Sequence, residues 1–492
     1  MVAVTEQSGA SASLKKAVGR GGFFTLGFGA MVGSGWVVVL GDWLRIAGPG
    51  GTIVGFLAGA IVMVLTCLCY GELAARFSTA GAEFLYALKT FGTRAGFLVG
   101  WFLTLFAVSI CSFEAIACAW LLRGLIPQIG LGTAYTVAGA PVTWDALFIG
   151  LGGALTIGGL HFRGAKSAIA FQNIATYGFI IVSAGLIVAG CTLGTSRHLK
   201  PLWETGGGGS WVVGSSWIFA TCAMFLNSWQ TALHALEERC SSVTIGKVVS
   251  SMVAAIIAGS AFYIGIVIAA ASAVPWKELV GGELPAVVAF RGLGLDGVLG
   301  TIVLVAAIVS LFKTWSAMTW IGSRLLFAQA RHGLLPRYLG VVDPLSGAPR
   351  AGVMVITFFA IVGLALGRAA ILPIVDMVSI CLALSLVFCL VVLIRRRSQD
   401  SGKPSYTVPG GTTTIVLALL GTIAMIGIAL VQPLIQNRGH VPVEWILLCA
   451  WGLLGLITWI LSSRSRRDDK SGYVEAVSTS NVTPCANGTS RP

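Results

Sequence analysis

Long apolar runs, separated by short polar segments, fill the chain from residue 23 to residue 462. A helix that crosses the roughly 30 Å hydrocarbon core of a bilayer needs about 20 such residues. The runs predict twelve spanning helices, at residues 23–44, 50–70, 96–122, 145–160, 168–192, 211–236, 250–274, 298–328, 351–367, 371–394, 412–432 and 443–462. We therefore predict an all-α polytopic membrane protein.

The cationic residues of the polar segments predict how these helices are oriented. Twelve spans place both termini on the same side of the membrane. If that side is the cytoplasm, 23 of the 32 Lys and Arg residues lie in inner segments and 8 in outer ones, while Lys313 lies within a span. An excess of cations on the inner side is the usual distribution. We expect a multi-pass protein of the cell membrane with both termini cytoplasmic.

Polar stretches bound the membrane domain, which we expect to cover residues 21–465. Residues 1–20 are polar and contain three cations, which predicts a cytoplasmic N-terminal tail rather than a cleaved signal peptide. Residues 466–492 are mostly polar, which predicts a disordered cytoplasmic tail.

Composition and motifs argue against several classes of protein. The chain is 56% hydrophobic and 10% charged, whereas a soluble domain is about 25% charged. The net charge is +13, but the Lys and Arg residues do not form a stripe with interleaved aromatics, so we expect no nucleic-acid partner. The 11 cysteines lack metal-ligand spacing, so we expect no metal and no cofactor. The absence of a zinc-protease motif, of paired in-span aspartates and of a phosphate-binding loop argues against an intramembrane enzyme and an ATP-driven pump.

The first apolar run contains an unusual concentration of small residues. Within Phe28–Trp36, which reads FGAMVGSGW, three glycines and a serine occupy the middle of a span. Glycine costs a helix roughly 1 kcal/mol relative to alanine, and an unpaired backbone amide in hydrocarbon costs several kcal/mol. The stretch therefore indicates either close packing against a neighbouring helix, as small-xxx-small motifs allow, or a break in the helix.

The sixth run favours a break. It contains polar Asn227, Ser228 and Gln230 at a depth comparable to that of the glycines in the first run. Interrupted helices at matching positions of two halves point to the binding site of a transporter. The amides at the start of a half-helix can hold a carboxylate, and the carbonyls at the end of another can hold an ammonium. Together the two breaks fit an α-amino acid.

Several ordered motifs resemble those of the amino acid–polyamine–organocation permease superfamily. They are Gly33–Gly35 followed by Ala47–Gly51, then Tyr70–Tyr86, the acidic pair Glu237–Glu238, Ser323–Pro336 and Gly347–Pro349. The resemblance runs from about Gly19 to Leu461 and implies an inverted repeat of five plus five spans, with spans one and six broken. The halves would cover about 21–195 and 210–397, followed by two further spans at about 410–463.

The resemblance also implies where a substrate binds. Val32, Gly33, Ser34 and Gly35 would offer amides or a hydroxyl to the carboxylate of the substrate. The backbone around Ala220, Cys222, Ala223, Met224 and Phe225 would take its ammonium, with Met224 at the position of an aromatic gate. Where relatives read Gly-Phe-Glu or Gly-Phe-Asp, this chain reads Ser228-Trp229-Gln230. The missing acid and the small residues favour a neutral amino acid.

Two ionisable residues lie inside predicted spans, where such residues are usually functional. Glu114 would bind substrate or couple transport to a proton, and Lys313 would take part in ion coupling; the alternative is a structural ion pair. Some proton-coupled relatives carry a span-five lysine that replaces sodium. That lysine is absent here, so Lys313 would fill the cation's place. Alternatively, Thr314, Ser316 and Thr319 would help to bind sodium.

The sequence therefore predicts a secondary active transporter that carries a neutral amino acid by alternating access with a coupling proton. The alternatives are a sodium-coupled symporter, an exchanger of amino acids and amines, and a carrier of polyamines or basic amino acids that uses Glu114. The sequence indicates no particular oligomeric state. We further expect His161 and His234 at the membrane interface, and one inner charge network of Glu72, Arg76, Arg324 and Arg331.

Overall fold

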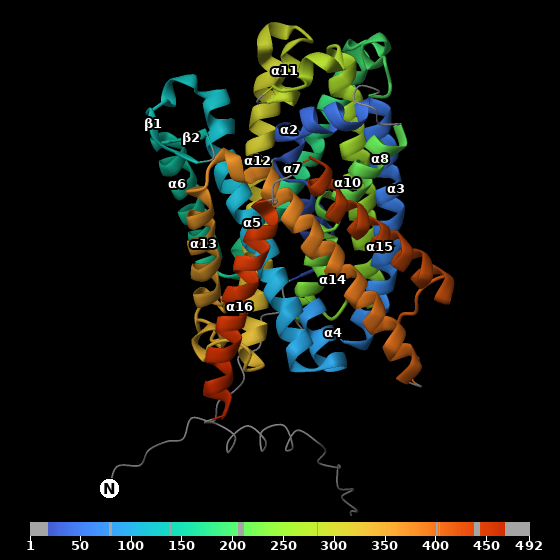
Figure 1. The fold of residues 1–492 in the computed structure, drawn as a ribbon, viewed down its shortest axis with the longest axis vertical. Helices are drawn as coiled ribbons and strands as arrows, with labels where there is room; N and C mark the ends of the chain where they lie inside the picture. Colours follow the sequence, from blue (N-terminus) through green and yellow to red (C-terminus); the bar gives the residue numbers. More distant parts are fainter. Residues whose placement is uncertain are drawn as a thin grey trace, which may run out of the picture.

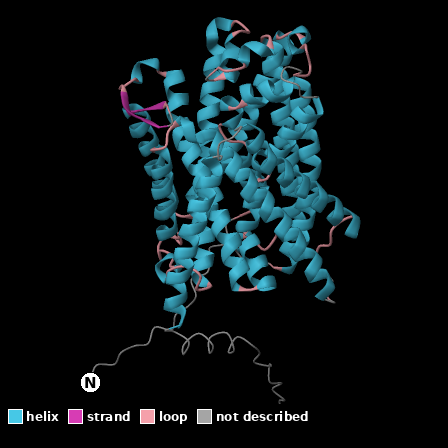
Figure 2. Ribbon diagram, viewed as in Figure 1, coloured by secondary structure: helices cyan, strands magenta, loops and turns pink. Residues whose placement is uncertain are grey.

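The computed structural model describes residues 18–77, 81–137, 139–204, 211–282, 284–399, 402, 404–436 and 443–467. They form a bundle of long helices, most of which run along the long axis of the molecule (Figure 1). One small hairpin of strands lies at the edge of the bundle (Figure 2). This helical architecture agrees with the predicted fold class, an all-α polytopic membrane protein.

The helices are α1 (Arg20–Met31), α2 (Gly35–Val38), α3 (Leu40–Arg76), α4 (Ala82–Phe91), α5 (Thr93–Leu125), α6 (Trp144–Phe162), α7 (Ala165–Leu193), α8 (Trp211–Phe225), α9 (Thr231–His234), α10 (Ile245–Ala273), α11 (Pro285–Arg291), α12 (Val298–Arg331), α13 (Arg350–Leu364), α14 (Ile371–Gln399), α15 (Gly411–Gln436) and α16 (Val443–Arg467). Short 3-10 turns are η1 (Pro127–Ile129), η2 (Ser196–Leu199), η3 (Ser228–Gln230), η4 (Leu236–Glu238), η5 (Trp276–Leu279), η6 (Leu295–Gly297), η7 (Arg337–Gly340) and η8 (Arg368–Ala370).

Ten helices of the described residues are long and apolar enough to cross a membrane. The apolar α13 is shorter, and the predicted sixth span is not one helix but α8 followed by η3 and α9. The multi-pass architecture is thus confirmed, while the count of twelve spans and the arrangement of the repeats stay predictions.

The predicted loop between spans three and four contains a feature that the apolar pattern does not reveal. Strands β1 (Thr133–Val137) and β2 (Ala140–Thr143) form an antiparallel hairpin. Tyr135 donates a hydrogen bond of 2.7 Å to the carbonyl of Ala365, which ties the hairpin to the end of α13. Neither strand alternates strictly between apolar and polar residues, which is the pattern by which a half-buried strand is recognised.

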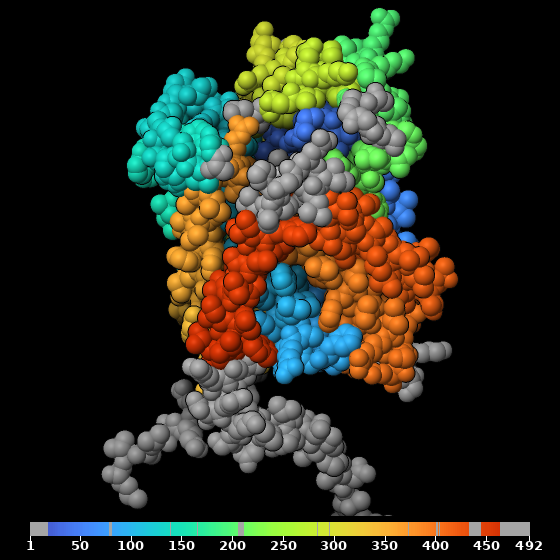
Figure 3. All heavy atoms as spheres, viewed as in Figure 1, coloured from blue at the N-terminus to red at the C-terminus, as the bar shows by residue number. Residues whose placement is uncertain are grey.

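Among the described spanning helices, α5 is the most enclosed by its neighbours, and α12 packs against it, while α15 and α16 lie on the face seen in Figure 3. The peripheral α16 is anchored to α5 by two tryptophans. Each indole N–H donates to the other residue's backbone carbonyl, Trp101 to Trp451 at 2.9 Å and Trp451 to Trp101 at 3.1 Å, and the rings stack 4.7 Å apart. These bonds satisfy both buried indole donors.

The two ends of the bundle carry different elements. The hairpin and α11 lie at one end, and α4 and the last turn of α16 lie at the other (Figure 1). At the N-terminal end of the described chain, Val18 N donates to Glu238 O at 2.9 Å and Cys240 N donates to Val18 O at 3.0 Å. Residues 1–17 of the predicted N-terminal tail and residues 468–492 of the predicted C-terminal tail lie outside the described residues. The helix α16 ends at Arg467, two residues into the predicted C-terminal tail.

A sharp bend at Gly48 separates the end of the first predicted span from the second. Its φ of 66° and ψ of 176° are inside the range that glycine alone adopts readily. A Cβ at this position would lie 2.8 Å from Glu204 N and 2.9 Å from Leu202 O, both of them backbone atoms. Both the backbone conformation and the available space therefore require glycine here.

We expect Gly48→Ala to destabilise the folded protein by about 1–3 kcal/mol, because the new side chain forces strain and a backbone shift. Gly152→Ala is the matched control, since a Cβ there meets nothing within 4 Å. Thermal unfolding of the two detergent-purified variants measures the difference. Equal melting temperatures would contradict this account of the bend.

Candidate functional site

The first span is interrupted where the sequence concentrates its small residues. The helix α1 ends at Met31, Val32 is extended with φ −101° and ψ 90°, and α2 begins at Gly35. All residues of this break, Val32 to Ser34, are buried. The glycines also permit close packing, because a Cβ on Gly29 would clash with Gln172 and Thr176 of α7. The glycine-rich stretch therefore serves both as a break in the helix and as a close packing contact.

Side chains of α12 hold the carbonyls that the break sets free. Ser310 Oγ lies 2.8 Å from Val32 O and 2.7 Å from Gly33 O, and Thr314 Oγ1 donates to Gly29 O at 2.8 Å. Lys313 Nζ donates to Gly29 O at 3.2 Å and also to Val32 O. Positions 310, 313 and 314 share one face of a helix. One stripe of α12 thus replaces the missing backbone hydrogen bonds of the first span.

The ammonium of Lys313 is fully buried. Besides the two carbonyls, it has the ring centroid of Phe179 at 4.8 Å and that of Phe28 at 5.8 Å, at distances that allow cation–π attraction. The positive charge is therefore held by dipoles and rings at the break. A metal cation at the position of this ammonium would meet the same carbonyl oxygens, those of Gly29 and Val32.

Glu114 of α5 approaches the break on its amide side. Ser34 donates to its carboxylate twice, from Oγ at 2.5 Å and from the backbone N–H at 3.4 Å. The side chain is 2% exposed, and a Cβ on Gly33 would collide with it. The carboxylate of Glu114 thus occupies the donors of Ser34, one of the four residues that the resemblance assigns to a substrate carboxylate.

The sixth predicted span is broken as well. After α8 ends at Phe225, the chain turns through Leu226 and Asn227 and continues as η3 and α9. The amide side chains of Asn227 and Gln230 are buried, and within the described chain they have no hydrogen-bond partner. The break persists although the glycine and the acid of the related motif are replaced, and it leaves polar groups available at its turn.

The two breaks face each other across a cavity of about 30 Å³, which is room for one water molecule. Its lining residues are Ala30, Met31, Gly33, Gly35, Ile110, Phe113, Glu114, Met224, Phe225, Ser228, Tyr263 and Thr314. The ring of Phe225 packs at 5.0 Å from Trp43 and 5.8 Å from Tyr263, and Tyr263 donates to Met31 O at 3.0 Å. Aromatic rings close this cavity, which is mostly apolar.

The structure brings part of the predicted substrate site together. Gly33, Gly35, Met224, Phe225 and Glu114 line the cavity, and Val32 and Ser34 complete the break. Two other predicted residues point elsewhere: Ala220 packs with Ile380 and Ala429, and Cys222 Sγ lies 3.7 Å from Gly55 O of α3. Ala223 is buried in α8 but does not line the cavity. Any role for these three residues would rest on their backbone.

The three predicted sodium ligands do not share one place. Thr314 is at the break, Ser316 lies 3.1 Å from His161 Nε2, and Thr319 donates to Trp315 O at 3.0 Å. Sequence reasoning missed Ser310, which was detectable as the residue three positions before Lys313 on the same helix face. It also missed Tyr263, an aromatic residue in an apolar run with no distinguishing pattern.

One expectation about charged residues is wrong, and another stays a prediction. Helices pack over the rings of His161 and His234, which are 4% and 1% exposed, and their place at the membrane interface stays a prediction. The expected single inner network is instead two groups. Glu72 pairs with Arg76 at 3.0 Å and Arg397 at 2.5 Å. Arg324 pairs separately with Glu238 at 2.6 Å.

The sequence profile of the amino acid permease family matches residues 22–458. The chain belongs to this family. The branched-chain amino acid permease BcaP of Bacillus subtilis (strain 168) is 23% identical over 461 residues, covering 92% of this chain and 94% of that protein. The methylthioribose transporter of the same strain is 24% identical, with 81% and 85% covered. L-asparagine permease 1 of Mycobacterium tuberculosis (strain ATCC 25618 / H37Rv) is 28% identical, with 69% and 68% covered.

Membership confirms the resemblance seen in the sequence and assigns the chain to the transport proteins of the amino acid–polyamine–organocation superfamily rather than to the enzymes. The two broken helices and the cavity between them are therefore the candidate substrate site of a permease. The described residues contain no cluster of His, Cys, Asp and Glu that could hold a metal ion.

The contact between the two breaks gives a direct test of their geometry. A Cβ on Gly35 would lie 2.8 Å from the ring of Phe225, so we expect Gly35→Ala to destabilise the permease by about 1–3 kcal/mol through overpacking. Phe225→Leu in the same chain should recover part of that loss. Melting temperatures of the single and double variants form a double-mutant cycle. Purely additive effects would mean that the two positions do not touch.

Proposed function

We propose that this permease is a secondary active transporter that carries a neutral amino acid, together with a proton, across the cell membrane. The observation that carries the proposal is the occupancy of the first-span break: Glu114 holds the amide and hydroxyl of Ser34, while Lys313 holds the carbonyls of Gly29 and Val32. A carboxylate and an ammonium from the protein thus stand at one break.

In the bound state, the carboxylate of the substrate takes the place of Glu114 on Ser34. Its ammonium meets backbone carbonyls at the end of α8, where a helix leaves its last carbonyls without helical partners. Its side chain faces the apolar lining formed by residues such as Ile110, Phe113 and Met224. Apart from Glu114, no charged side chain lines the described cavity, which favours a neutral substrate.

Coupling to a proton follows from displacement. When Glu114 leaves Ser34 it loses both of its donors in a site that excludes water, and a buried ionised carboxylate without partners is strongly unfavourable. Binding of a proton to Glu114 removes that cost and frees the donors for the substrate. Substrate and proton therefore bind together, which is the requirement for symport.

Lys313 explains why no sodium ion is needed in this scheme. Its ammonium is directed at the carbonyl oxygens of Gly29 and Val32, which with Thr314 Oγ1 would otherwise suit a small cation. In this scheme the ammonium of Lys313 stays on these two carbonyls throughout the transport cycle. Sodium coupling would require Lys313 to vacate this place.

The transport cycle in this proposal is alternating access by twelve spans arranged as two inverted repeats of five, with two further spans and both termini in the cytoplasm. The breaks in the first and sixth predicted spans support this arrangement, since they occupy corresponding positions of the two halves. The related branched-chain amino acid permease and L-asparagine permease support an amino acid as the substrate class.

Counterflow into proteoliposomes loaded with each member of a panel of amino acids and polyamines tests the function and its coupling. We expect exchange of neutral amino acids, and uphill uptake driven by an inward proton gradient but not by sodium. Exchange that never becomes uphill under any gradient would indicate an obligate exchanger. Transport of polyamines or basic amino acids alone, or stimulation by sodium alone, would contradict the proposal.

Glu114→Gln tests the proton step with the same substrate. A glutamine still accepts a hydrogen bond from Ser34 but does not titrate. We expect counterflow to persist within about tenfold of wild type while proton-driven accumulation is lost. Asp42→Asn, at an exposed ion pair with Arg45, is the control that should leave both unchanged. Undiminished accumulation by Glu114→Gln would exclude this residue as the coupling group.

Lys313→Ala tests the role of the fixed cation. It removes the ammonium from the carbonyls of Gly29 and Val32, which keep only their hydroxyl contacts with Thr314 and Ser310. We expect uptake at least about tenfold lower in sodium-free buffer, because a hydrogen bond to a charged group contributes roughly 1.5–3 kcal/mol. We also expect added sodium to restore part of the activity. Uptake that is reduced equally with and without sodium, with an unchanged pH profile, would assign Lys313 a structural role only.

A further inference from the structure

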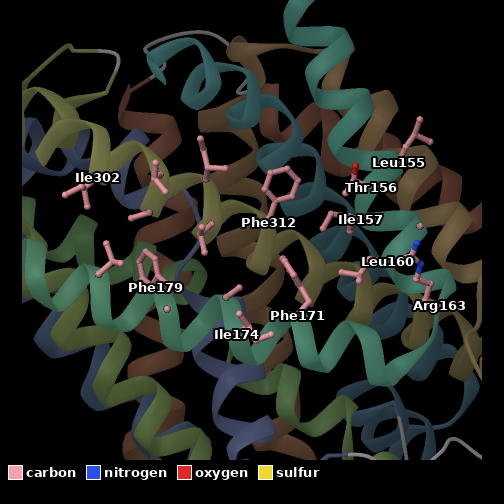
Figure 4. Close-up of a pocket in the computed structure, with 18 of the residues that line it drawn as sticks. Leu155, Thr156, Ile157, Leu160, Arg163, Phe171, Ile174, Phe179, Ile302 and Phe312 are labelled. Atoms are coloured by element: carbon pink, nitrogen blue, oxygen red, sulfur yellow. The ribbon is translucent and has the colours of Figure 1, made fainter. Parts of the chain in front are cut away.

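A second cavity is separate from the candidate substrate site. It is a groove of about 1220 Å³ on the flank of the bundle, between α6, α7 and α12 (Figure 4). Almost all of its lining is apolar, and its polar side chains are those of Thr156, Thr301 and Arg163. An amino acid would find few partners in it.

The groove faces the lipid. Two residues of its wall, Ile174 of α7 and Val305 of α12, are 77% and 48% exposed, although both are apolar and lie within spanning helices. Along α7 the lining extends from Phe171 to Val182, about 16 Å at 1.5 Å per residue. That length matches one leaflet of a hydrocarbon core about 30 Å thick. The dimensions suit an acyl chain.

A cation stands at one end of this groove. Arg163 lies in the turn between α6 and α7, and Figure 4 shows it at the opposite side of the lining from Ile302. Its side chain is exposed and makes no hydrogen bond or ion pair with any residue that the structure describes. The exposed Lys166 follows in the first turn of α7. These two residues carry positive charge where the apolar lining ends.

The predicted orientation places this turn at the cytoplasmic leaflet, where anionic lipids are concentrated and where basic pockets between spanning helices bind their headgroups. A guanidinium binds phosphate with two parallel hydrogen bonds. We propose that the groove binds one anionic phospholipid, with its phosphate on Arg163 and an acyl chain lying between α7 and α12.

This lipid would lie directly behind the first-span break. Phe179 belongs to the groove wall, and its ring centroid is 4.8 Å from Lys313 Nζ. Phe312, the neighbour of Lys313 in sequence, belongs to the same wall. An acyl chain in the groove therefore supports the rings that surround the buried ammonium. The lipid site itself stands whether or not the proposed transport function is correct, because its test measures binding.

Native mass spectrometry of the purified full chain, with phosphatidylglycerol or phosphatidylcholine added, measures the occupancy. We expect wild type to bind phosphatidylglycerol more tightly, and Arg163→Gln to lose that preference by about tenfold. Arg94→Gln removes an exposed cation from the start of α5, outside the groove, and should behave as wild type. An unchanged preference in Arg163→Gln, or an equal loss in Arg94→Gln, would overturn the headgroup assignment.

Filling the groove tests the acyl chain. A Cβ on Gly178, which lines the groove, or on Gly185, which does not, meets nothing within 4 Å. We expect Gly178→Phe to lose the bound lipid and Gly185→Phe to keep it. Ala175→Phe, also in the lining, serves if Gly178→Phe does not fold, as judged by size-exclusion chromatography. Full lipid occupancy in a folded groove-filling variant would overturn the proposal.

Discussion

An interrupted backbone in the middle of a membrane span is the constraint on which this structure depends. Val32 to Ser34 leave the helix where no lipid can replace the lost hydrogen bonds, and each unpaired group would cost several kcal/mol. The protein supplies partners from two other helices, Ser310, Lys313 and Thr314 for the carbonyls and Glu114 for an amide. The candidate substrate site therefore lies where the protein must supply partners for the backbone groups of the break.

The same contacts give the proposed transport cycle its logic. The partners of these carbonyls on α12 include the ammonium of Lys313, so side chains of the protein satisfy that side of the break. The partner on the amide side is a carboxylate, which resembles the charged end of an amino acid and can be replaced by it. We propose that this difference separates the two functions of the break: Lys313 maintains it, and Glu114 exchanges with the substrate.

The sequence predicted the interrupted first span, the break in the sixth, and both intramembrane charges, because glycine clusters and ionisable residues stand out in apolar runs. It did not predict the hairpin of β1 and β2, whose strands do not alternate strictly between apolar and polar residues. Ser310 escaped because an isolated serine is common in spanning helices. The sequence also did not predict the burial of His161 and His234, which depends on neighbouring helices. The pairing of Arg324 with Glu238 depends on tertiary contacts across 86 positions.

The most direct test of the central claim is a cryo-EM structure of the permease bound to the amino acid that gives the strongest counterflow. The account predicts that the carboxylate of the substrate lies on the backbone N–H and hydroxyl of Ser34, that Glu114 has turned away from both, and that Lys313 still contacts the carbonyls of Gly29 and Val32. A substrate bound elsewhere, with Glu114 still on Ser34, would contradict it.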